Sequence, residues 1–174
     1  MGCNWAFKSP SYFLPVPKPK ESKQGYLKMI WTLSIECIMG MYQHHDCVRV
    51  IEIESEASLL DLHDAIQAAV NFDRDHLFEF FGGRNWRNRK VVFEDSYDTG
   101  DLFDTYASIP LEDVYPLPKG CKLHYHFDFG DDWYFEVKKN RKKPKEPEKG
   151  VQYPRLIESV GPDPEQYPGV GEWQ

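Results

Sequence analysis

Residues 31–37 alternate strictly between apolar and polar side chains, which restricts this part of the chain to one kind of structure. The apolar positions are Trp31, Leu33, Ile35 and Cys37. A repeat of two places these side chains on one face of an extended backbone, so the segment is predicted to be a half-buried β-strand. Residues 47–54 are rich in β-branched side chains and form a second predicted strand. Because Gly40 lies in the connection between them, we expect an antiparallel hairpin.

A helix is predicted to begin after Ser58, whose hydroxyl can accept from the amide near Asp61 in a variant of the capping box. Apolar residues then recur at helical spacing, and Asn71 is expected to help end the helix. They are Leu59, Leu62, Ile66 and Val70.

Four further strands are predicted later in the chain, at residues 76–81, 90–95, 122–129 and 133–139. Gly82 and Gly83 are expected to close the first of them. The acidic residues 97–109 are predicted to be weakly helical at best, a short helix is expected from Pro110, and the tail from Tyr153 shows no periodicity. Together these elements predict an α+β domain, in which a mixed, mainly antiparallel, curved sheet packs on one long helix in a roll-like arrangement.

The composition favours one soluble globular domain. Hydrophobic residues make up 41% of the 174 residues, which is enough for an ordinary core. The net charge of -7 argues against a general nucleic-acid binder, since phosphate contacts need clustered Lys and Arg. The longest apolar stretch, residues 29–42, is too short and too polar to span a membrane, and no secretory signal is visible, so we expect a cytoplasmic protein. Residues 1–26 hold four prolines and are expected to form an N-terminal arm.

The run HFDFGDDWYFEV, residues 126–137, places three aspartates between two aromatic segments. We predict that they form a hairpin turn, with Gly130 at a position of positive φ and the aspartates accepting hydrogen bonds from turn amides. The alternative is an acidic binding site at a sheet edge, because a glycine and a tryptophan beside exposed carboxylates also suit a cleft. The candidate binding residues are Tyr125, Asp128, Asp131, Asp132 and Trp133.

Histidines raise two further possibilities. His124 and His126 share a strand face with Asp128 and have a spacing known for metal ligands, but we expect neither a metal nor a cofactor. The four cysteines lie far apart without a CxxC pair, so free thiols are expected.

A catalytic site would need different residues. His63 lies in the apolar stripe of the predicted helix, where a buried histidine usually donates to a backbone carbonyl. If His63, His76 and Asp128 met in a cleft, they would provide a histidine–carboxylate pair for acid–base chemistry, with Asp131 as a further candidate. The sequence alone does not bring these residues together.

Three segments in a fixed order resemble the Ri-plasmid ORF-three-like family, which is widespread on bacterial and archaeal chromosomes and mobile elements. They are residues 59–81, 125–137 and 153–169. The matching residues are Asp61, Leu62, His63, Ile66, Gln67, His76, Leu77, Phe80, Tyr125, Asp128, Phe129, Gly130, Asp131 and Trp133. The resemblance places the domain at residues 27–174 and implies an α+β fold without an established chemistry.

The chain departs from the family pattern at two places. Cys47, Val48 and Arg49 stand where the family usually has Trp-Arg-Arg. The Pro-Pro-Glu-Asp-x-Gly-Gly tail of the family is reduced here to Pro162, Pro164, Glu165 and a lone Gly169.

Three hypotheses of function follow. The first is a non-catalytic accessory or binding domain, associated with plasmids and mobile elements, with a protein as its partner. The second is a metal-dependent hydrolase or nuclease-like enzyme that uses Asp128, Asp131 and a histidine. The third is a nucleic-acid-binding protein that uses Arg84, Arg87, Arg89 and the basic run at residues 138–145. The kinase meaning of Asp-Phe-Gly is excluded, because the chain has no Gly-rich phosphate loop and no His-Arg-Asp motif.

Overall fold

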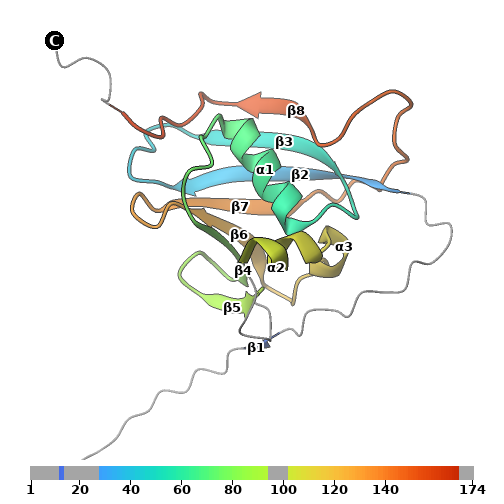
Figure 1. Ribbon diagram of the computed structural model, residues 1–174, viewed down its shortest axis with the longest axis horizontal. Helices are drawn as coiled ribbons and strands as arrows, with labels where there is room; N and C mark the ends of the chain where they lie inside the picture. Colours follow the sequence, from blue (N-terminus) through green and yellow to red (C-terminus); the bar gives the residue numbers. More distant parts are fainter. Residues whose placement is uncertain (1–11, 14–27, 94–101, 169–174) are drawn as a thin grey trace, which may run out of the picture.

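The computed structural model describes residues 12–13, 28–93 and 102–168, which form eight strands and three helices (Figure 1). The strands are β1 (Tyr12–Phe13), β2 (Ile30–Met39), β3 (Cys47–Glu54), β4 (Phe78–Gly83), β5 (Arg89–Val92), β6 (Lys122–Phe127), β7 (Trp133–Lys139) and β8 (Arg155–Val160). The helices are α1 (Leu59–Val70), α2 (Leu102–Ser108) and α3 (Leu111–Val114). Among the described residues, no helix is long and apolar enough to cross a membrane.

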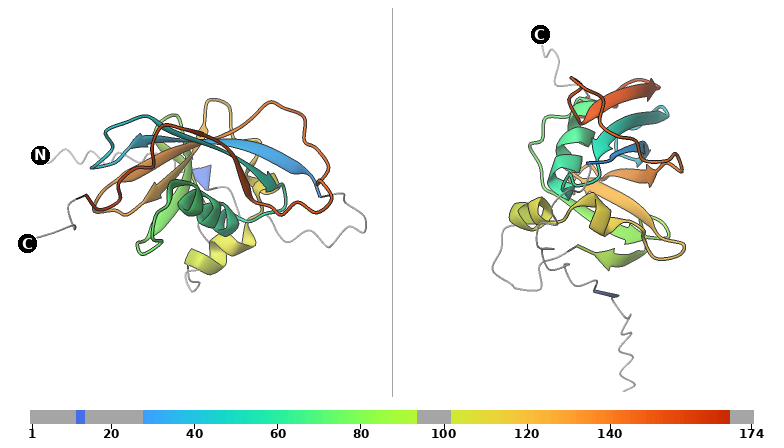
Figure 2. Two further views of the ribbon diagram at one scale, coloured as in Figure 1. Left: turned by 90° about the horizontal axis from the view of Figure 1, so that it is seen from above. Right: turned by 90° about the vertical axis from the view of Figure 1, so that its right-hand side faces the viewer.

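All strands belong to one sheet, in the order β1-β5-β4-β6-β7-β2-β3-β8. Every neighbouring pair from β5 to β8 is antiparallel, and only the short β1 runs parallel to its neighbour β5. The sheet arches over the helices, which all lie on one of its faces (Figure 2). The predicted α+β domain with a mainly antiparallel sheet is therefore confirmed, but the sheet is open and does not close into a roll.

The expectation of one long helix is correct only in part. Helix α1 has 12 residues, and α2 and α3 pack beside it with seven and four residues. Residues 97–109 were expected to be weakly helical at best, yet α2 covers Leu102–Ser108. The reason is burial: Tyr106 and Ile109 are both 3% exposed, so tertiary packing outweighs the low helix propensity of the acidic segment.

The hairpin of β2 and β3 follows the alternation in the sequence. In residues 31–37 the apolar side chains are buried and the polar ones between them are half-buried, and the two strands pair antiparallel as predicted. Cys37 lies directly opposite Cys47, and neither forms a disulfide. Burial raises the pKa of the Cys37 thiol to about 12, so the group is a neutral thiol at physiological pH.

Helix α1 begins and ends as the sequence predicts. The Ser58 hydroxyl accepts from the amide of Asp61 at 3.1 Å, and the Asp61 carboxylate accepts from the amide of Ser58 at 2.7 Å. Asn71 ends the helix in the left-handed conformation, with φ of 59°. These two caps satisfy backbone groups that the helix leaves free, and they fix α1 against the sheet.

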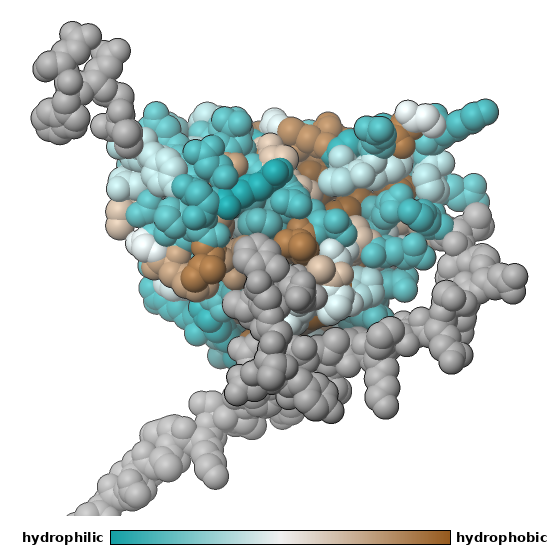
Figure 3. Space-filling view, in the orientation of Figure 1, coloured by the Kyte–Doolittle hydropathy of each residue, from teal (hydrophilic) through white to brown (hydrophobic). Residues whose placement is uncertain are grey.

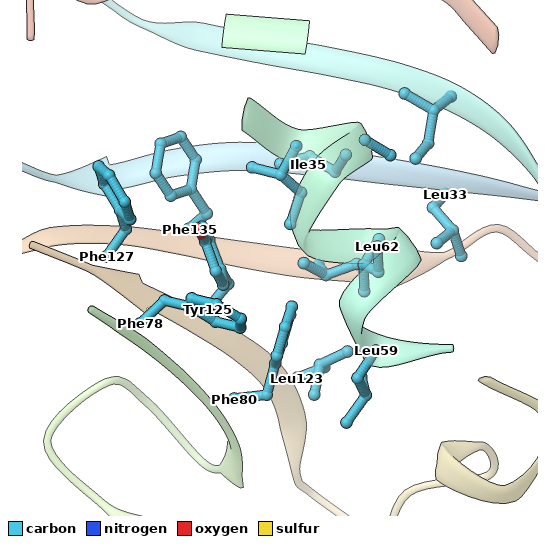
Figure 4. Packing of buried hydrophobic residues seen from close by; sticks show 14 of the residues in the cluster. Leu33, Ile35, Leu59, Leu62, Phe78, Phe80, Leu123, Tyr125, Phe127 and Phe135 are labelled. Atoms are coloured by element: carbon cyan, nitrogen blue, oxygen red, sulfur yellow. The ribbon is translucent and has the colours of Figure 1, made fainter. Parts of the chain in front are cut away.

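The core lies between α1 and the face of the sheet that carries the helices (Figure 4). Aromatic side chains fill its half near the β6–β7 loop, where Phe78, Tyr125, Phe127 and Phe135 point towards one another. Aliphatic side chains fill the other half, around Leu62. The opposite face of the sheet, called the outer face below, carries no helix.

Arg49 holds the tail of the domain in place. Its side chain is 2% exposed, and it donates to the carbonyl of Ala69 at the end of α1 and to the carbonyl of Val160 in β8. It also forms an ion pair with Asp163 at 2.6 Å. Arg49 therefore ties α1, β3 and the segment after β8 to one another.

Several expected boundaries are corrected by the structure. The tail shows no periodicity in the sequence and no strand was predicted there, but Arg155–Val160 forms β8 beside β3. Gly82 and Gly83 do not close a strand, because β4 begins at Phe78 and includes both. Pro110 caps α3 and is not its first helical residue. Of the predicted arm at 1–26, only Tyr12–Phe13 is described, as β1 beside β5, and the rest lies outside the described residues, as does Gly169.

Candidate functional site

The loop of residues 128–132 joins β6 to β7, and one carboxylate holds it together. Asp128 Oδ1 accepts from the amide of Gly130 at 3.0 Å and from that of Asp131 at 3.4 Å. The carbonyl of Asp128 accepts from the amide of Asp132 at 2.8 Å. This is the predicted turn, but the positive φ values belong to Asp128 and Asp132, both at 53°, and not to Gly130. Aspartate tolerates this region because its short side chain bonds locally.

His126 connects the loop to the outer face of the sheet. Its Nε2 lies 3.0 Å from Asp132 Oδ1, and its Nδ1 lies 3.0 Å from Glu79 Oε1. Carboxylates only accept hydrogen bonds, so each of the two carboxylates is an acceptor for the ring nitrogen that faces it. The ring stacks on Tyr134 at 3.9 Å between centroids, and Phe129 covers it at 4.7 Å.

His76 and Asp128 meet at the surface, in front of the loop. His76 Nε2 lies 3.5 Å from Asp128 Oδ2 and 3.8 Å from Asp75 Oδ1. Asp75 accepts from the hydroxyl of Tyr167 at 2.6 Å, and this hydrogen bond lowers the pKa of Asp75. Partial burial and the same bond raise the pKa of Tyr167 to about 12. The result is a histidine beside two carboxylates, with 41% of the histidine side chain exposed.

His63 does not join this group. It is buried, and its Nδ1 accepts from the hydroxyl of Tyr125 at 2.7 Å, which in turn accepts from Gln67 at 2.9 Å. The expectation of a backbone carbonyl partner is therefore wrong. Burial lowers the pKa of His63 to about 4, so the ring is neutral and stacks on Phe78 at 3.7 Å.

The packing explains why the three proposed catalytic residues do not share a cleft. Phe127 lies 6.4 Å from the ring of His63 and 6.1 Å from that of His76, and it forms part of the core. Only His76 and Asp128 come together, and the side chain of Asp131 is half-buried.

Two of the candidate binding residues are core residues. Tyr125 and Trp133 are fully buried, so they form no part of the surface. They pack in the core and support the strands that carry the loop. Trp133 packs on Gly40 in the β2–β3 turn, and the amide of Met41 in that turn donates to the carbonyl of Asp131 at 2.9 Å. The loop is therefore supported from both sides.

Exposed apolar side chains surround the loop, and sequence reasoning did not find this group. Met41, Leu77, Phe129 and Tyr167 are 59%, 61%, 51% and 38% exposed. Phe129 is in the loop itself, while the carbonyl of Leu77 accepts from the amide of Asp128 at 3.0 Å. Figure 3 shows hydrophobic surface at the left of the molecule, at the end where the loop lies in Figure 1. These four residues and residues 128–132 are called the tip surface below.

The arrangement of the other histidines does not form a metal centre. Within residues 28–93 and 102–168, no three His, Cys, Asp or Glu side chains are grouped to hold a metal ion. His126 is occupied by carboxylates, and Asp128 is turned towards its own loop and His76. His124 is fully buried on the outer face and stacks on Phe81, and burial lowers its pKa.

Most of the basic candidates for nucleic-acid binding have partners within the domain. Arg89 donates to Glu79 at 2.7 Å, and Arg87 lies over the ring of Trp86 at 4.4 Å. Lys138 and Lys145 pair with glutamates of the sheet. The exposed cations that remain in the basic run are Arg141, Lys142 and Lys143.

Comparison with known proteins now places the chain. Residues 38–173 match the family model described as "Plasmid pRiA4b ORF-3-like protein". The chain belongs to this family. As a member, it shares 29% identity over 132 residues with the uncharacterized protein y4hQ of Sinorhizobium fredii (strain NBRC 101917 / NGR234), which covers 72% of this chain and 60% of the relative. The chain thus spans less than two thirds of that protein.

A solved structure has the same fold as this family member. It is the protein of unknown function MM3350 from Methanosarcina mazei Go1, with a TM-score of 0.57 and 23% identity. The match covers 77% of this chain and 70% of that one. The matched family, the relative and the solved structure carry no assigned activity in their descriptions.

Proposed function

We propose that this chain is a non-catalytic protein-binding domain that contacts its partner through the tip surface. The observation that carries the proposal is that exposed apolar side chains lie in the acidic loop and in the two segments whose backbone is hydrogen-bonded to it, at Met41 and Leu77. Single exposed apolar residues are normal on proteins, whereas a contiguous group rimmed by polar residues marks an interaction site. The family description refers to a plasmid reading frame. We therefore also propose that the partner is a cytoplasmic protein encoded by plasmids or other mobile elements.

The charges of the tip surface indicate a basic partner segment. Asp132 is 54% exposed at the side chain. Within the described part of the chain, the carboxylate of Asp131 makes no hydrogen bond or ion pair. A partner that places Lys or Arg beside apolar side chains would neutralise these carboxylates while covering Phe129 and Leu77.

The loop is ordered before binding, which favours recognition. Its bend is fixed by Asp128, its far end by Asp132 and His126, and its carbonyl at Asp131 by Met41. Less conformational entropy is then lost on association, so a small contact area can still support specific binding.

Selection of random phage-displayed peptides on the full chain tests the proposal. Enriched peptides are expected to combine Lys or Arg with leucine or aromatic residues, and to lose binding to a Phe129→Ser variant. Leu156→Ser provides a matched control, because Leu156 is similarly exposed, at 48%, but lies on β8. The proposal is overturned if no peptide is enriched, or if the selected peptides bind the Phe129→Ser variant as well as they bind the unaltered chain.

A second candidate function is hydrolysis, which the pairing of the exposed His76 with the nearly buried Asp128 favours. It predicts that Mn²⁺ changes tryptophan fluorescence at micromolar concentration, that Asp128→Ala abolishes this change, and that a His76→Gln variant loses cleavage of plasmid DNA or of an activated ester. No metal-dependent fluorescence change together with unaltered cleavage in the His76→Gln variant would remove this candidate.

A further inference from the structure

A cleft lies beside the tip surface, between the β2–β3 turn and the segment after β8. Its volume is about 340 Å³, which is large enough for one long side chain but small for a folded element. Tyr42 and His45 line it from the turn, and residues 162–165 line it from the tail. The ion pair of Arg49 with Asp163 holds the tail wall in place.

The chemistry of the cleft suits a cation. Asp163 and Glu165 line it together with His44 and His45, and none of the described Lys or Arg side chains does. The guanidinium of Arg49 donates from Nη2 to Oδ1 of Asp163 at 2.6 Å, which leaves Oδ2 for a ligand. The carboxylate of Glu165 is exposed and has no partner among the described residues.

The remaining walls favour a planar cation over a compact one. Tyr42 is half-buried and packs against the core, so its ring is a fixed surface, and Pro162 and Pro164 form the opposite rigid side. A guanidinium group stacks on such surfaces, is more weakly hydrated than an ammonium, and donates in parallel to carboxylates.

Both walls of the cleft adjoin residues of the tip surface along the chain. Met41 directly precedes Tyr42, and Tyr167 follows Glu165 by two positions, with Gln166 buried between them and bonded to Asp75 at 3.0 Å. This closeness in the sequence is the reason to connect the cleft with a segment bound at the tip surface. We propose that this cleft binds the guanidinium group of an arginine in the partner segment, an inference that rests on the proposed protein-binding function.

The test uses two small probes on the full chain, followed by ¹H–¹⁵N NMR. Nα-acetyl-arginine methylamide is expected to shift the amide signals of residues 42–45 and 163–165, with an affinity in the millimolar range. The matching citrulline compound has nearly the same shape but no charge, and it is expected to bind at least about fivefold more weakly. Equal binding of the two probes, or shifts confined to other residues, would overturn the inference.

Variants separate the cleft from the rest of the surface. Glu165→Gln is expected to weaken binding of the arginine probe about three- to tenfold, whereas Glu158→Gln on the exposed side of β8 leaves it unchanged. An equal effect of the two variants contradicts the inference.

The peptide selection distinguishes the two proposals. If selected peptides need Phe129 but bind equally with arginine replaced by citrulline, the cleft inference fails and the binding function stands. If the arginine probe binds in the cleft but no peptide is selected, the binding function fails.

Discussion

At the scale of single residues, Asp128 shows how a carboxylate can be structural. Its side chain is only 9% exposed, and its oxygens bond the amides of Gly130 and Asp131 and approach His76. The residue also adopts a positive φ, which alanine disfavours. One carboxylate oxygen, Oδ1, is thus occupied by the bend, while Oδ2 faces His76.

Two replacements of Asp128 therefore distinguish the hydrogen bonds of its side chain from its negative charge. Asp128→Ala should lower the free energy of unfolding by about 2 kcal/mol, because turn amides lose their acceptor and alanine is strained at this φ. Asp128→Asn keeps an acceptor oxygen and should cost under about 1 kcal/mol. Urea unfolding measures both, with Asp131→Ala as control, and equal losses for Ala and Asn would contradict the structural role.

Gly40 is required for a different reason, which is space. A Cβ atom at this position would lie 2.1 Å from Cε3 of the buried Trp133. Gly40→Ala should therefore cost at least about 2 kcal/mol and change the near-UV circular dichroism of Trp133. At Gly130 a Cβ would lie 3.2 Å from Asp128 Oδ1, so Gly130→Ala should cost under about 1 kcal/mol. A larger loss at Gly130 than at Gly40 would reverse this assignment.

At the scale of secondary structure, patterns local to one element were sufficient for most of the sheet. The alternation at 31–37, the β-branched run at 47–54 and the cap at Ser58 each indicated an element that the structure contains. Strand β8 could not be found in this way. Its Leu156 and Ile157 are adjacent and both exposed, and a bulge opposite Val50 and Ile51 breaks the repeat of two.

The candidate site was predictable to a smaller extent. The bend at Asp128 follows from residues that are neighbours in the sequence, and it was found. The tip surface and the cleft depend on segments that only the fold brings together, such as Met41 with Phe129 and Tyr42 with Glu165. Likewise, the separation of His63 from His76 depends on the position of Phe127.

Removal of the Arg49 side chain should destabilise the junction of α1, β3 and β8 without an equal effect on the rest of the sheet. Arg49→Met keeps much of the side-chain volume but leaves the carbonyls of Ala69 and Val160 without this donor, at a cost of about 3 kcal/mol. Hydrogen exchange should then accelerate most in residues 155–168. Lys142→Met, a change at an exposed cation of the basic run, is the control, and uniform acceleration over the sheet would argue against a local junction.

At the scale of the whole molecule, His63 couples stability to pH. Its pKa is about 4 in the folded chain and about 6.5 when unfolded, so the unfolded chain binds more protons between these values. Stability is then fully present above about pH 6.5 and falls as the pH decreases towards 4.

The size of this effect can be measured by urea unfolding. Between about pH 7 and about pH 5, His63 should account for a decrease of about 2 kcal/mol in the free energy of unfolding. This decrease should be absent in His63→Gln. His44→Gln, in the exposed β2–β3 turn, should keep the dependence of the unaltered chain. If His63→Gln has an unchanged slope, His63 is not the group responsible.

The ion pair of Arg49 with Asp163 joins positions 114 residues apart, and this has a consequence for synthesis. A nascent chain on the ribosome presents β3 long before β8 emerges to cover its edge. During that interval Arg49, which is buried in the folded chain, lacks both the carboxylate of Asp163 and the carbonyl of Val160. Until β8 has been synthesised, the sheet therefore has an uncovered edge at β3, and such an edge favours misassembly.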